Sequence, residues 1–154
     1  MIREARIYLS DKSDSAIVTA IYDNEASLLY EQEETLIVSN RCDPIAIAST
    51  LRNAIERFKR RDRNLRDYKI TEWPAYRASN CRSVKEFESR YLQIFVKAAN
   101  ESELCYLAFA KPIGEEEIEL RVTLNRYGSD EEIGQKILRL FDICSKWNSL
   151  ANGK

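Results

Sequence analysis

The sequence predicts an α+β fold built from two ββββα units, because the second half of the chain repeats the hydrophobic plan of the first. In residues 3–58, short stretches of alternating apolar and polar residues precede one helical stretch, and the same order recurs in residues 91–147. A period of two is typical of half-buried strands, and a period near 3.6 is typical of amphipathic helices. We therefore expect a single domain over residues 1–154, with antiparallel sheets and two packed helices.

The two halves match at apolar positions, as internal repeats do. The matched positions are Ile7–Leu9 with Ile94–Val96, Ile17 with Leu104, Leu36 and Val38 with Val122 and Leu124, and Ile47, Leu51, Ile55 and Phe58 with Ile133, Ile137, Phe141 and Cys144. We expect the sheets of the two units to pack their apolar faces against each other and against both helices.

The first unit, residues 3–58, is interpreted as two hairpins followed by a helix. The expected strands are residues 3–9, 16–22, 28–30 and 35–38, which are rich in residues that favour strands. Asp43 and Pro44 predict a helix start, because aspartate accepts from free backbone N–H groups and proline suits the first helical position. One face of this helix carries Ile47, Leu51, Ala54, Ile55 and Phe58.

The second unit, residues 91–147, has expected strands at 91–98, 104–110 and 118–124. Ser129 and Glu132 have the spacing of a capping box at the start of the last helix. This helix is expected to bury Ile133, Ile137, Leu140, Phe141, Cys144 and Trp147. We interpret Cys105 and Cys144 as small buried hydrophobic residues.

Residues 59–90 form an insert between the units and are the least regular part of the chain. Trp73–Tyr76 is expected to be an ordered, partly apolar loop, and Ser83 is placed to cap a short helix. An insert of this length is either functional or a plain crossover between the two units.

Histidine is absent from the sequence, and this excludes several kinds of active site. Histidine is the usual general base near neutral pH and the commonest metal ligand. Serine or cysteine hydrolase triads, zinc hydrolase sites and histidine-based ribonuclease chemistry are therefore excluded in their usual form. The four cysteines stand singly, without the CxxC spacing of a metal site. We expect no catalysis, no metal and no cofactor.

The sequence also predicts a cytoplasmic protein without membrane association. Its apolar runs are all much shorter than the roughly 20 residues needed to cross a bilayer. The first residues, Met1–Ala5, alternate at once and lack the apolar core of a signal peptide.

Acidic residues gather in two stretches that the matched halves place in corresponding hairpins, one within residues 23–34 and one within residues 115–119. Acidic hairpins either keep sheet edges from pairing with other chains or form a docking surface for a basic partner. The residues that we predict to bind a protein partner are Glu31, Glu33, Glu34, Glu115, Glu116 and Glu117.

A basic stretch from Arg52 to Arg66 precedes several aromatic residues. Cations meet phosphates and flat rings stack on bases, so this pattern fits single-stranded nucleic acid. It equally fits a solvated helix end, and the net charge of −1 gives no overall attraction to nucleic acid. The nucleic-acid-binding residues of this alternative are Arg57, Lys59, Arg60, Arg61, Arg63, Trp73 and Tyr76.

Two consecutive ββββα units around an insert resemble the Whirly and PUR-type architecture, which implies binding of single-stranded DNA or RNA. The lysine-glycine-lysine-alanine motif of plant Whirly proteins has no counterpart here, so no binding residue is carried over. The small size, the lack of catalytic residues and the even mix of charges are also similar to bacterial immunity proteins, including those of contact-dependent growth inhibition systems. Such proteins bind and block one cognate toxin domain, often a basic nuclease.

We therefore expect a non-catalytic binding protein. The first hypothesis is an immunity protein that binds a nuclease-type toxin domain through its acidic residues. The alternative is a single-stranded DNA- or RNA-binding protein of Whirly/PUR-like type. A third possibility is a homodimer that uses Trp73, Tyr76 or Trp147 at its interface, and the sequence leaves the oligomeric state open.

Overall fold

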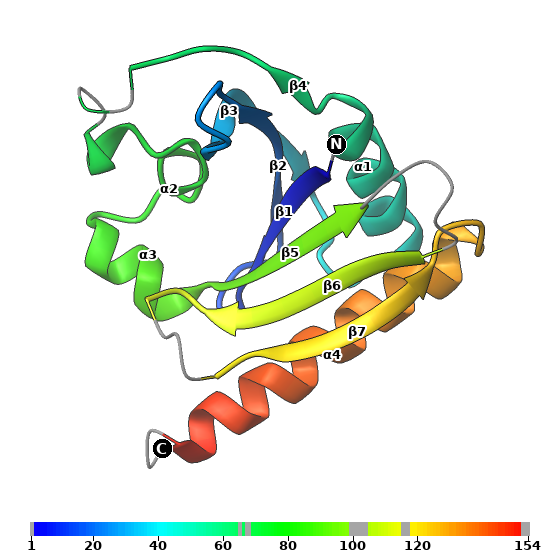
Figure 1. Cartoon of the computed structure of the whole chain (residues 1–154). Helices are drawn as coiled ribbons and strands as arrows, with labels where there is room; N and C mark the ends of the chain where they lie inside the picture. The colour runs from blue at the N-terminus through cyan, green and yellow to red at the C-terminus, as the bar shows by residue number, and fades with distance from the viewer. Residues whose placement is uncertain (1, 65, 67–68, 99–104, 115–117, 152–154) are drawn as a thin grey trace.

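The computed structural model describes the chain except residues 1, 65, 67–68, 99–104, 115–117 and 152–154 (Figure 1). The strands are β1 (Arg3–Leu9), β2 (Ala16–Asp23), β3 (Leu29–Val38), β4 (Lys59–Arg60), β5 (Leu92–Ala98), β6 (Cys105–Pro112) and β7 (Leu120–Asn125). The helices are α1 (Pro44–Glu56), α2 (Pro74–Ala78), α3 (Val84–Arg90) and α4 (Asp130–Ala151), with a 3-10 turn, η2, at Ile70–Glu72. The predicted α+β class is confirmed.

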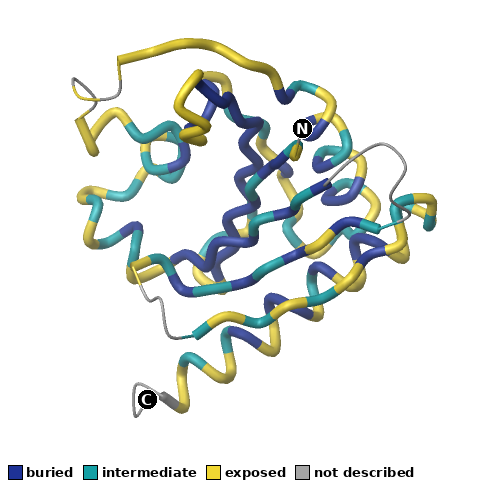
Figure 2. The backbone as a smooth tube through the Cα atoms, viewed as in Figure 1, coloured by how far each residue is buried: buried dark blue, intermediate teal, exposed yellow. Residues whose placement is uncertain are grey.

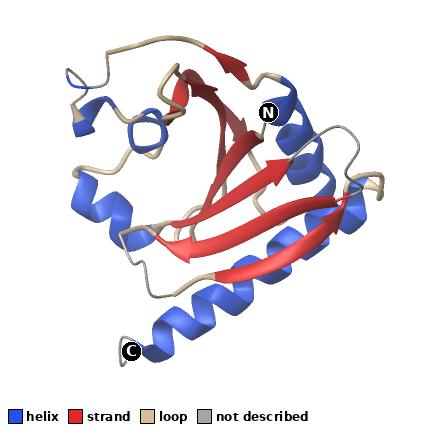
Figure 3. Cartoon of the chain, in the orientation of Figure 1, coloured by secondary structure: helices blue, strands red, loops and turns tan. Residues whose placement is uncertain are grey.

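The strands form one seven-stranded sheet with the order β3-β2-β1-β5-β6-β7 (Figure 3). Its neighbours are antiparallel, except that the two-residue β4 pairs with β2 in parallel. β1 and β5 pair from Arg3 opposite Ala98 to Leu9 opposite Leu92, and this pairing joins the two halves of the chain. The expectation of separate sheets packed face to face is therefore wrong. A hydrophobic pattern shows which face of a strand is buried, but it does not show which strands pair.

Helices α1 and α4 cover one face of the sheet and contact each other. The apolar side chains of β1, β2, β5 and β6 on this face pack against both helices in the main core. Asp43 caps α1 as predicted, since its carboxylate accepts from the Ala46 N–H at 3.1 Å. Ser129 and Glu132 form the predicted capping box of α4 through two hydrogen bonds of 3.1 Å. Local signals placed both helices correctly.

The opposite face carries α2 and α3, but only over the half of the sheet made by the first strands (Figure 1). Tyr8 and Ile17 of the sheet pack there with Ala75, Phe87 and Tyr91 in a second, smaller core. Ser83 caps α3 as predicted, accepting from the Glu86 N–H at 3.1 Å. Figure 2 shows the chain buried along β1 and β2 and largely intermediate or exposed along β7.

Several expected details differ from the structure. The stretches 28–30 and 35–38 are not two strands around a turn: Leu29–Val38 is one strand, with a register shift opposite Thr19 and Ile21, so the first unit is βββα. Trp147 is 58 % exposed, because α4 extends past the core. Cys144 is buried as predicted, whereas Cys105 is only half-buried.

The strand order is compatible with two related βββα units, although the duplication itself stays a prediction. Ile7 lies opposite Ile94, the residue with which the sequence matches it. Farther out the match is lost, because the two hairpins have different registers. Tyr8 faces Ile17 in the first hairpin, whereas Phe95, the sequence match of Tyr8, faces Phe109, which is not the match of Ile17. Leu104, the predicted match of Ile17, lies outside the described residues. One row of partners crosses six strands as Leu36, Val18, Ile7, Ile94, Ala110 and Leu120.

At Gly134, α4 comes close to the backbone of Pro44 at the start of α1. A Cβ added at this position would lie 1.9 Å from the backbone oxygen of Pro44. We expect Gly134→Ala to lower the free energy of unfolding by about 1–3 kcal/mol, because the helices must separate, despite the higher helix propensity of alanine. Urea unfolding monitored by circular dichroism measures this.

Lys136→Ala is the matched control, since Lys136 is exposed on the same helix. It should change stability by no more than about 0.5 kcal/mol. A Gly134→Ala protein as stable as the wild type would show that the two helices are not held at this distance.

Candidate binding surfaces

Glu31 is the centre of a buried polar network beneath α2. Its side chain is 6 % exposed and accepts hydrogen bonds from the Tyr8 hydroxyl and from the Ala75 N–H, the latter at 3.0 Å. The Gln93 amide donates to the Tyr8 oxygen at 2.6 Å. Buried carboxylates are tolerated when such donors satisfy them. Glu31, predicted to meet a partner, therefore points into the protein and ties α2 to the sheet.

The environment of this network shifts two pKa values. Burial is the largest reason why the pKa of the Tyr8 hydroxyl lies well above its ordinary value, and the charge of Glu31 raises it further. Burial alone would lower the pKa of Arg6, but Tyr8, Glu4 and Glu31 together hold it above its ordinary value. Tyr8 is therefore a neutral donor, and Arg6 stays charged.

The predicted acidic and basic residues meet along the outer strands in what we call the charged seam: Asp23, Glu33 and Glu34 against Arg57, Arg60 and Arg61. The ion pairs are Arg60–Asp23 at 3.3 Å, Arg61–Glu33 at 3.0 Å and Arg57–Glu34 at 3.3 Å. Glu33 and Glu34 are 55 % and 78 % exposed, so these pairs are screened and individually weak. The two sets of charges that the sequence separates thus largely neutralise each other.

The backbone of the basic stretch is held against β3 by side chains of that strand. The Gln32 amide donates to the carbonyl oxygens of Ile21 and Arg57, at 3.2 and 2.7 Å. The Tyr30 hydroxyl donates to the carbonyl oxygen of Arg61. Lys59 lies over the ring of Tyr22, with its Nζ 5.6 Å from the ring centroid. These contacts hold the backbone of Arg57 and Arg61 against β3 and place Lys59 beside Tyr22.

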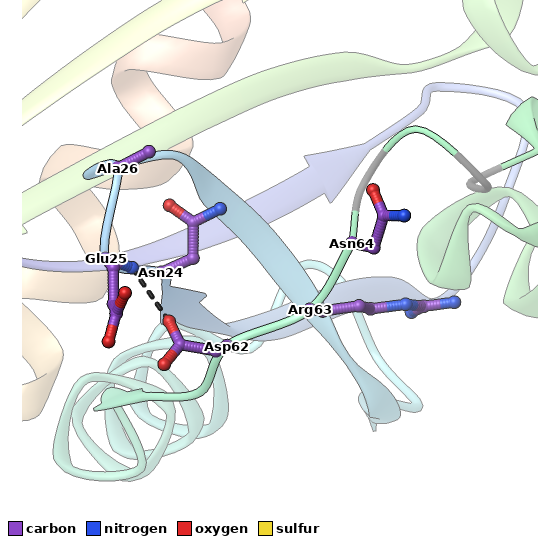
Figure 4. A pocket seen from close by; sticks show the side chains of 6 residues that line it. All are labelled: Asn24, Glu25, Ala26, Asp62, Arg63 and Asn64. Atoms are coloured by element: carbon purple, nitrogen blue, oxygen red, sulfur yellow. Dashed lines mark hydrogen bonds between the residues drawn. The ribbon is translucent and has the colours of Figure 1, made fainter.

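A shallow hollow of about 350 Å³ lies beside the charged seam (Figure 4). It is lined by Asn24, Glu25, Ala26, Asp62, Arg63 and Asn64. The Glu25 N–H donates to the Asp62 carboxylate at 2.9 Å, which links the β2–β3 turn to the insert. Arg63 pairs with Glu72 at 3.7 Å. The hollow is open, and five of its six lining residues carry polar side chains, which suits contact with a protein surface better than enclosure of a small molecule.

The insert aromatics serve the second core. Trp73 lies edge-on to Phe87, with centroids 4.9 Å apart, and Tyr76 lies 6.0 Å from the same ring. Both are partly buried against this cluster. The structure therefore brings Trp73 and Tyr76 to the same ring, Phe87, but it does not bring them to the arginines of the charged seam. Trp73 and Tyr76 therefore act as packing residues in the insert, and α2 replaces the loop expected there.

The sequence reasoning missed a second charged surface on the sheet itself. Arg6, Phe95, Lys97, Phe109, Lys111 and Arg121 share the uncovered half of the face that carries α2 and α3, and we call this set the basic–aromatic face. Strand alternation places each of these residues on one side of its own strand. The pairing of four strands was needed to bring them together.

The described residues contain no group of three or more side chains that would hold a metal ion. Within the same part of the chain, no helix is long and apolar enough to span a bilayer. The predicted residues Glu115, Glu116 and Glu117 lie outside the described residues.

No family model and no curated protein matches the chain. Among the solved structures that share its fold are the following two. A protein of unknown function from Neisseria meningitidis, NMB0488, is 12 % identical with a TM-score of 0.65, over 94 % of this chain and 96 % of that one. A chain of the CdiA-CT/CdiI toxin and immunity complex from Yersinia pseudotuberculosis is 10 % identical with a TM-score of 0.64, over 94 % of this chain and 98 % of that one.

Glu31→Gln should lower the free energy of unfolding by about 1–3 kcal/mol, because an amide cannot accept from both the Tyr8 hydroxyl and the Ala75 N–H as the carboxylate does. Glu33→Gln, on the same strand but exposed, should change it by less than about 0.5 kcal/mol. Chemical denaturation at pH 7 measures both. Equal effects of the two substitutions would contradict the assignment of Glu31 as the residue that ties α2 to the sheet.

Tyr8→Phe should make the free energy of unfolding fall less steeply as pH rises above about 10. In the unfolded chain tyrosine ionises near pH 10, whereas the folded protein holds the Tyr8 proton to higher pH. As pH rises above about 10, ionisation of Tyr8 therefore stabilises the unfolded state relative to the folded state. The free energy of unfolding then falls by up to about 1.4 kcal/mol per pH unit. Denaturation between about pH 9 and pH 11 measures this slope, with the exposed Tyr127→Phe as the control. A slope unchanged in Tyr8→Phe would contradict the shift.

Proposed function

We propose that the chain is an immunity protein that binds and neutralises a nuclease-type toxin domain without catalysis of its own. The observation that carries this proposal is the agreement of fold, over nearly the whole length of both chains, with a chain of a toxin and immunity complex. The absence of histidine, which removes the commonest general base, also favours binding over catalysis. An inhibitor of such a toxin would act in the cytoplasm, as the sequence predicts.

The charged seam and the hollow beside it form the surface that we propose for the toxin. Glu33 and Glu34 are exposed there, and their arginine partners are held only by weak, solvent-screened ion pairs. A basic partner can therefore replace those arginines with its own cations at small cost. Complementary charge raises the association rate and suppresses wrong partners. Glu115, Glu116 and Glu117 remain part of the proposal as a second acidic contact.

Nucleic-acid binding through the insert is a weaker candidate. Its aromatic residues pack in the second core, and its arginines pair with carboxylates of the same chain. No described contact leaves a ring of the insert beside an unpaired cation, which is the arrangement that stacking and phosphate binding need.

The proposal predicts that the gene directly upstream encodes a large secreted protein with a toxin at its C-terminus, and the test uses that C-terminal domain. Co-expression should restore growth to cells that produce that domain, and the two proteins should co-purify as a complex. The double variant Glu33→Lys/Glu34→Lys should weaken the complex at least about tenfold, mostly through a slower association rate. Surface plasmon resonance at two salt concentrations measures this.

Asp142→Lys is the matched control, because Asp142 is exposed on α4, away from the seam. It should leave binding unchanged. Full toxicity in the presence of the wild-type chain would overturn the function, whereas normal affinity of the double variant would overturn only the surface. Reversal of Glu115, Glu116 and Glu117 in a separate variant tests the second acidic contact in the same assay.

A further inference from the structure

The basic–aromatic face lies where the sheet has no covering helix. Figure 1 shows β5, β6 and β7 toward the viewer, with α4 behind them and with α2 and α3 to one side. The contacts of α2 are with β2 and β3, and α3 adds Phe87 to the cluster around Tyr8. In the described part of the chain, this half of the sheet is therefore open on one face.

Strand pairing arranges the open side chains in rows. Arg6 faces Phe95, Phe95 faces Phe109, and Phe109 faces Arg121, so one row crosses four strands. Lys97 lies in the neighbouring row on one side and Lys111 in the row on the other. The centre of the face is thus a pair of adjacent phenylalanine rings surrounded by four cations.

Each ring is approached by two of these cations. The Arg6 guanidinium carbon and the Lys111 Nζ lie 5.2 and 5.3 Å from the centroid of Phe95. The Lys97 Nζ and the Arg121 guanidinium carbon lie 5.5 and 4.7 Å from the centroid of Phe109. Such contacts are weak where water reaches them, so the long side chains of Lys97, Lys111 and Arg121 can leave the rings for a better anionic partner without backbone movement. Arg6 stays in place, because its side chain is only 16 % exposed and pairs with Glu4.

The carboxylates on this face do not balance the cations. Glu4 is buried and shared by Arg6 at 2.9 Å and Lys97 at 3.7 Å, and Glu119 pairs with Arg121 at 3.3 Å. Lys111 has no carboxylate within 4.0 Å among the residues that the structure describes. Among the residues that the structure describes, four cations against two carboxylates make this face positive, on a chain whose net charge is −1.

We propose that the basic–aromatic face binds a short stretch of single-stranded nucleic acid. Phe95 and Phe109 lie on adjacent strands and offer two neighbouring rings on which successive bases can stack. Lys97, Lys111 and Arg121 lie around these rings, where their long side chains can reach the phosphates, and Arg6, which is held by Glu4, adds positive charge beside Phe95. Stacking on aromatic rings is stronger than the exposed cation–ring contacts that it replaces.

A carboxylate-rich peptide is the competing occupant, and the rings distinguish the two. A peptide of this kind needs the cations but not two flat rings side by side, whereas a single strand uses both. Binding of nucleic acid should therefore require the flat aromatic ring of Phe109, and another apolar side chain at this position should not replace it. It should also be independent of the proposed toxin surface, which lies on the outer strands of the other half of the sheet.

The test measures fluorescence anisotropy of a labelled oligothymidine of about ten nucleotides, titrated with the full chain at low salt. We expect micromolar binding and a log–log salt slope of about −2, since Lys97, Lys111 and Arg121 each contribute about 0.7 to the slope with a single strand. Phe109→Leu should weaken binding about tenfold while it keeps the apolar volume. Lys111→Gln should weaken binding and reduce the magnitude of the salt slope by about 0.7.

Lys136→Gln, which removes an exposed lysine on α4 of the opposite face, is the matched control and should change nothing. If Phe109→Leu unfolds by circular dichroism, Arg121→Gln carries the test, because Arg121 is exposed on the edge strand β7. A flat titration, or oligothymidine binding that Phe109→Leu and Arg121→Gln leave intact, would overturn the proposal. Tighter binding of a polyglutamate peptide than of oligothymidine would overturn it in favour of an acidic protein partner. None of these results bears on toxin neutralisation.

Discussion

The antiparallel pairing of β1 with β5 is the constraint on which the rest of the structure depends. It joins β3-β2-β1 and β5-β6-β7 into one sheet, and every later arrangement follows from that continuity. Because strand side chains alternate, Ala5, Ile7 and Leu9 point to one face together with Ile94 and Val96. That face is apolar in both halves, so it needs two helices to cover it, and α1 and α4 meet over it. The close approach at Gly134 lets them share one core.

The same pairing gives the opposite face a polar centre that the chain must satisfy. Glu4, Arg6 and Tyr8 point to this side, beside Gln93 and Lys97 of β5. A buried carboxylate without donors would cost several kcal/mol, and Glu31 avoids this cost by accepting from Tyr8 and from the first turn of α2. The insert is thus required by the sheet, since it supplies a donor to a buried acid and apolar cover for Tyr8.

The parts of the fold that the sequence predicted are those set by local signals. Asp43, Ser83 and Ser129 cap helices because their partners lie three residues away, and the apolar stripe of α1 is visible in the sequence alone. The run Glu31–Glu34 was predicted to be the turn of a hairpin, but it continues a strand. Its first carboxylate is satisfied by Tyr8 and Ala75, both far away in the sequence. When a buried charged residue is satisfied by donors far away in the sequence, the residues next to it do not show that it is buried.

The candidate sites were hard to predict for a related reason. The sequence shows how many charges a segment carries, but pairing across strands decides which of them stay available. Residues 23–34 were interpreted as a surface for a protein partner and residues 57–63 as an alternative surface for nucleic acid, but the fold sets their charges against each other in the charged seam. Arg6, Lys97, Lys111 and Arg121 looked like ordinary strand residues, yet strand pairing gathers them around two rings. Since α2 and α3 cover only half of that face, the other half keeps an excess of positive charge among the residues that the structure describes. Surfaces that can bind partners are therefore those left over after the fold has paired its own charges.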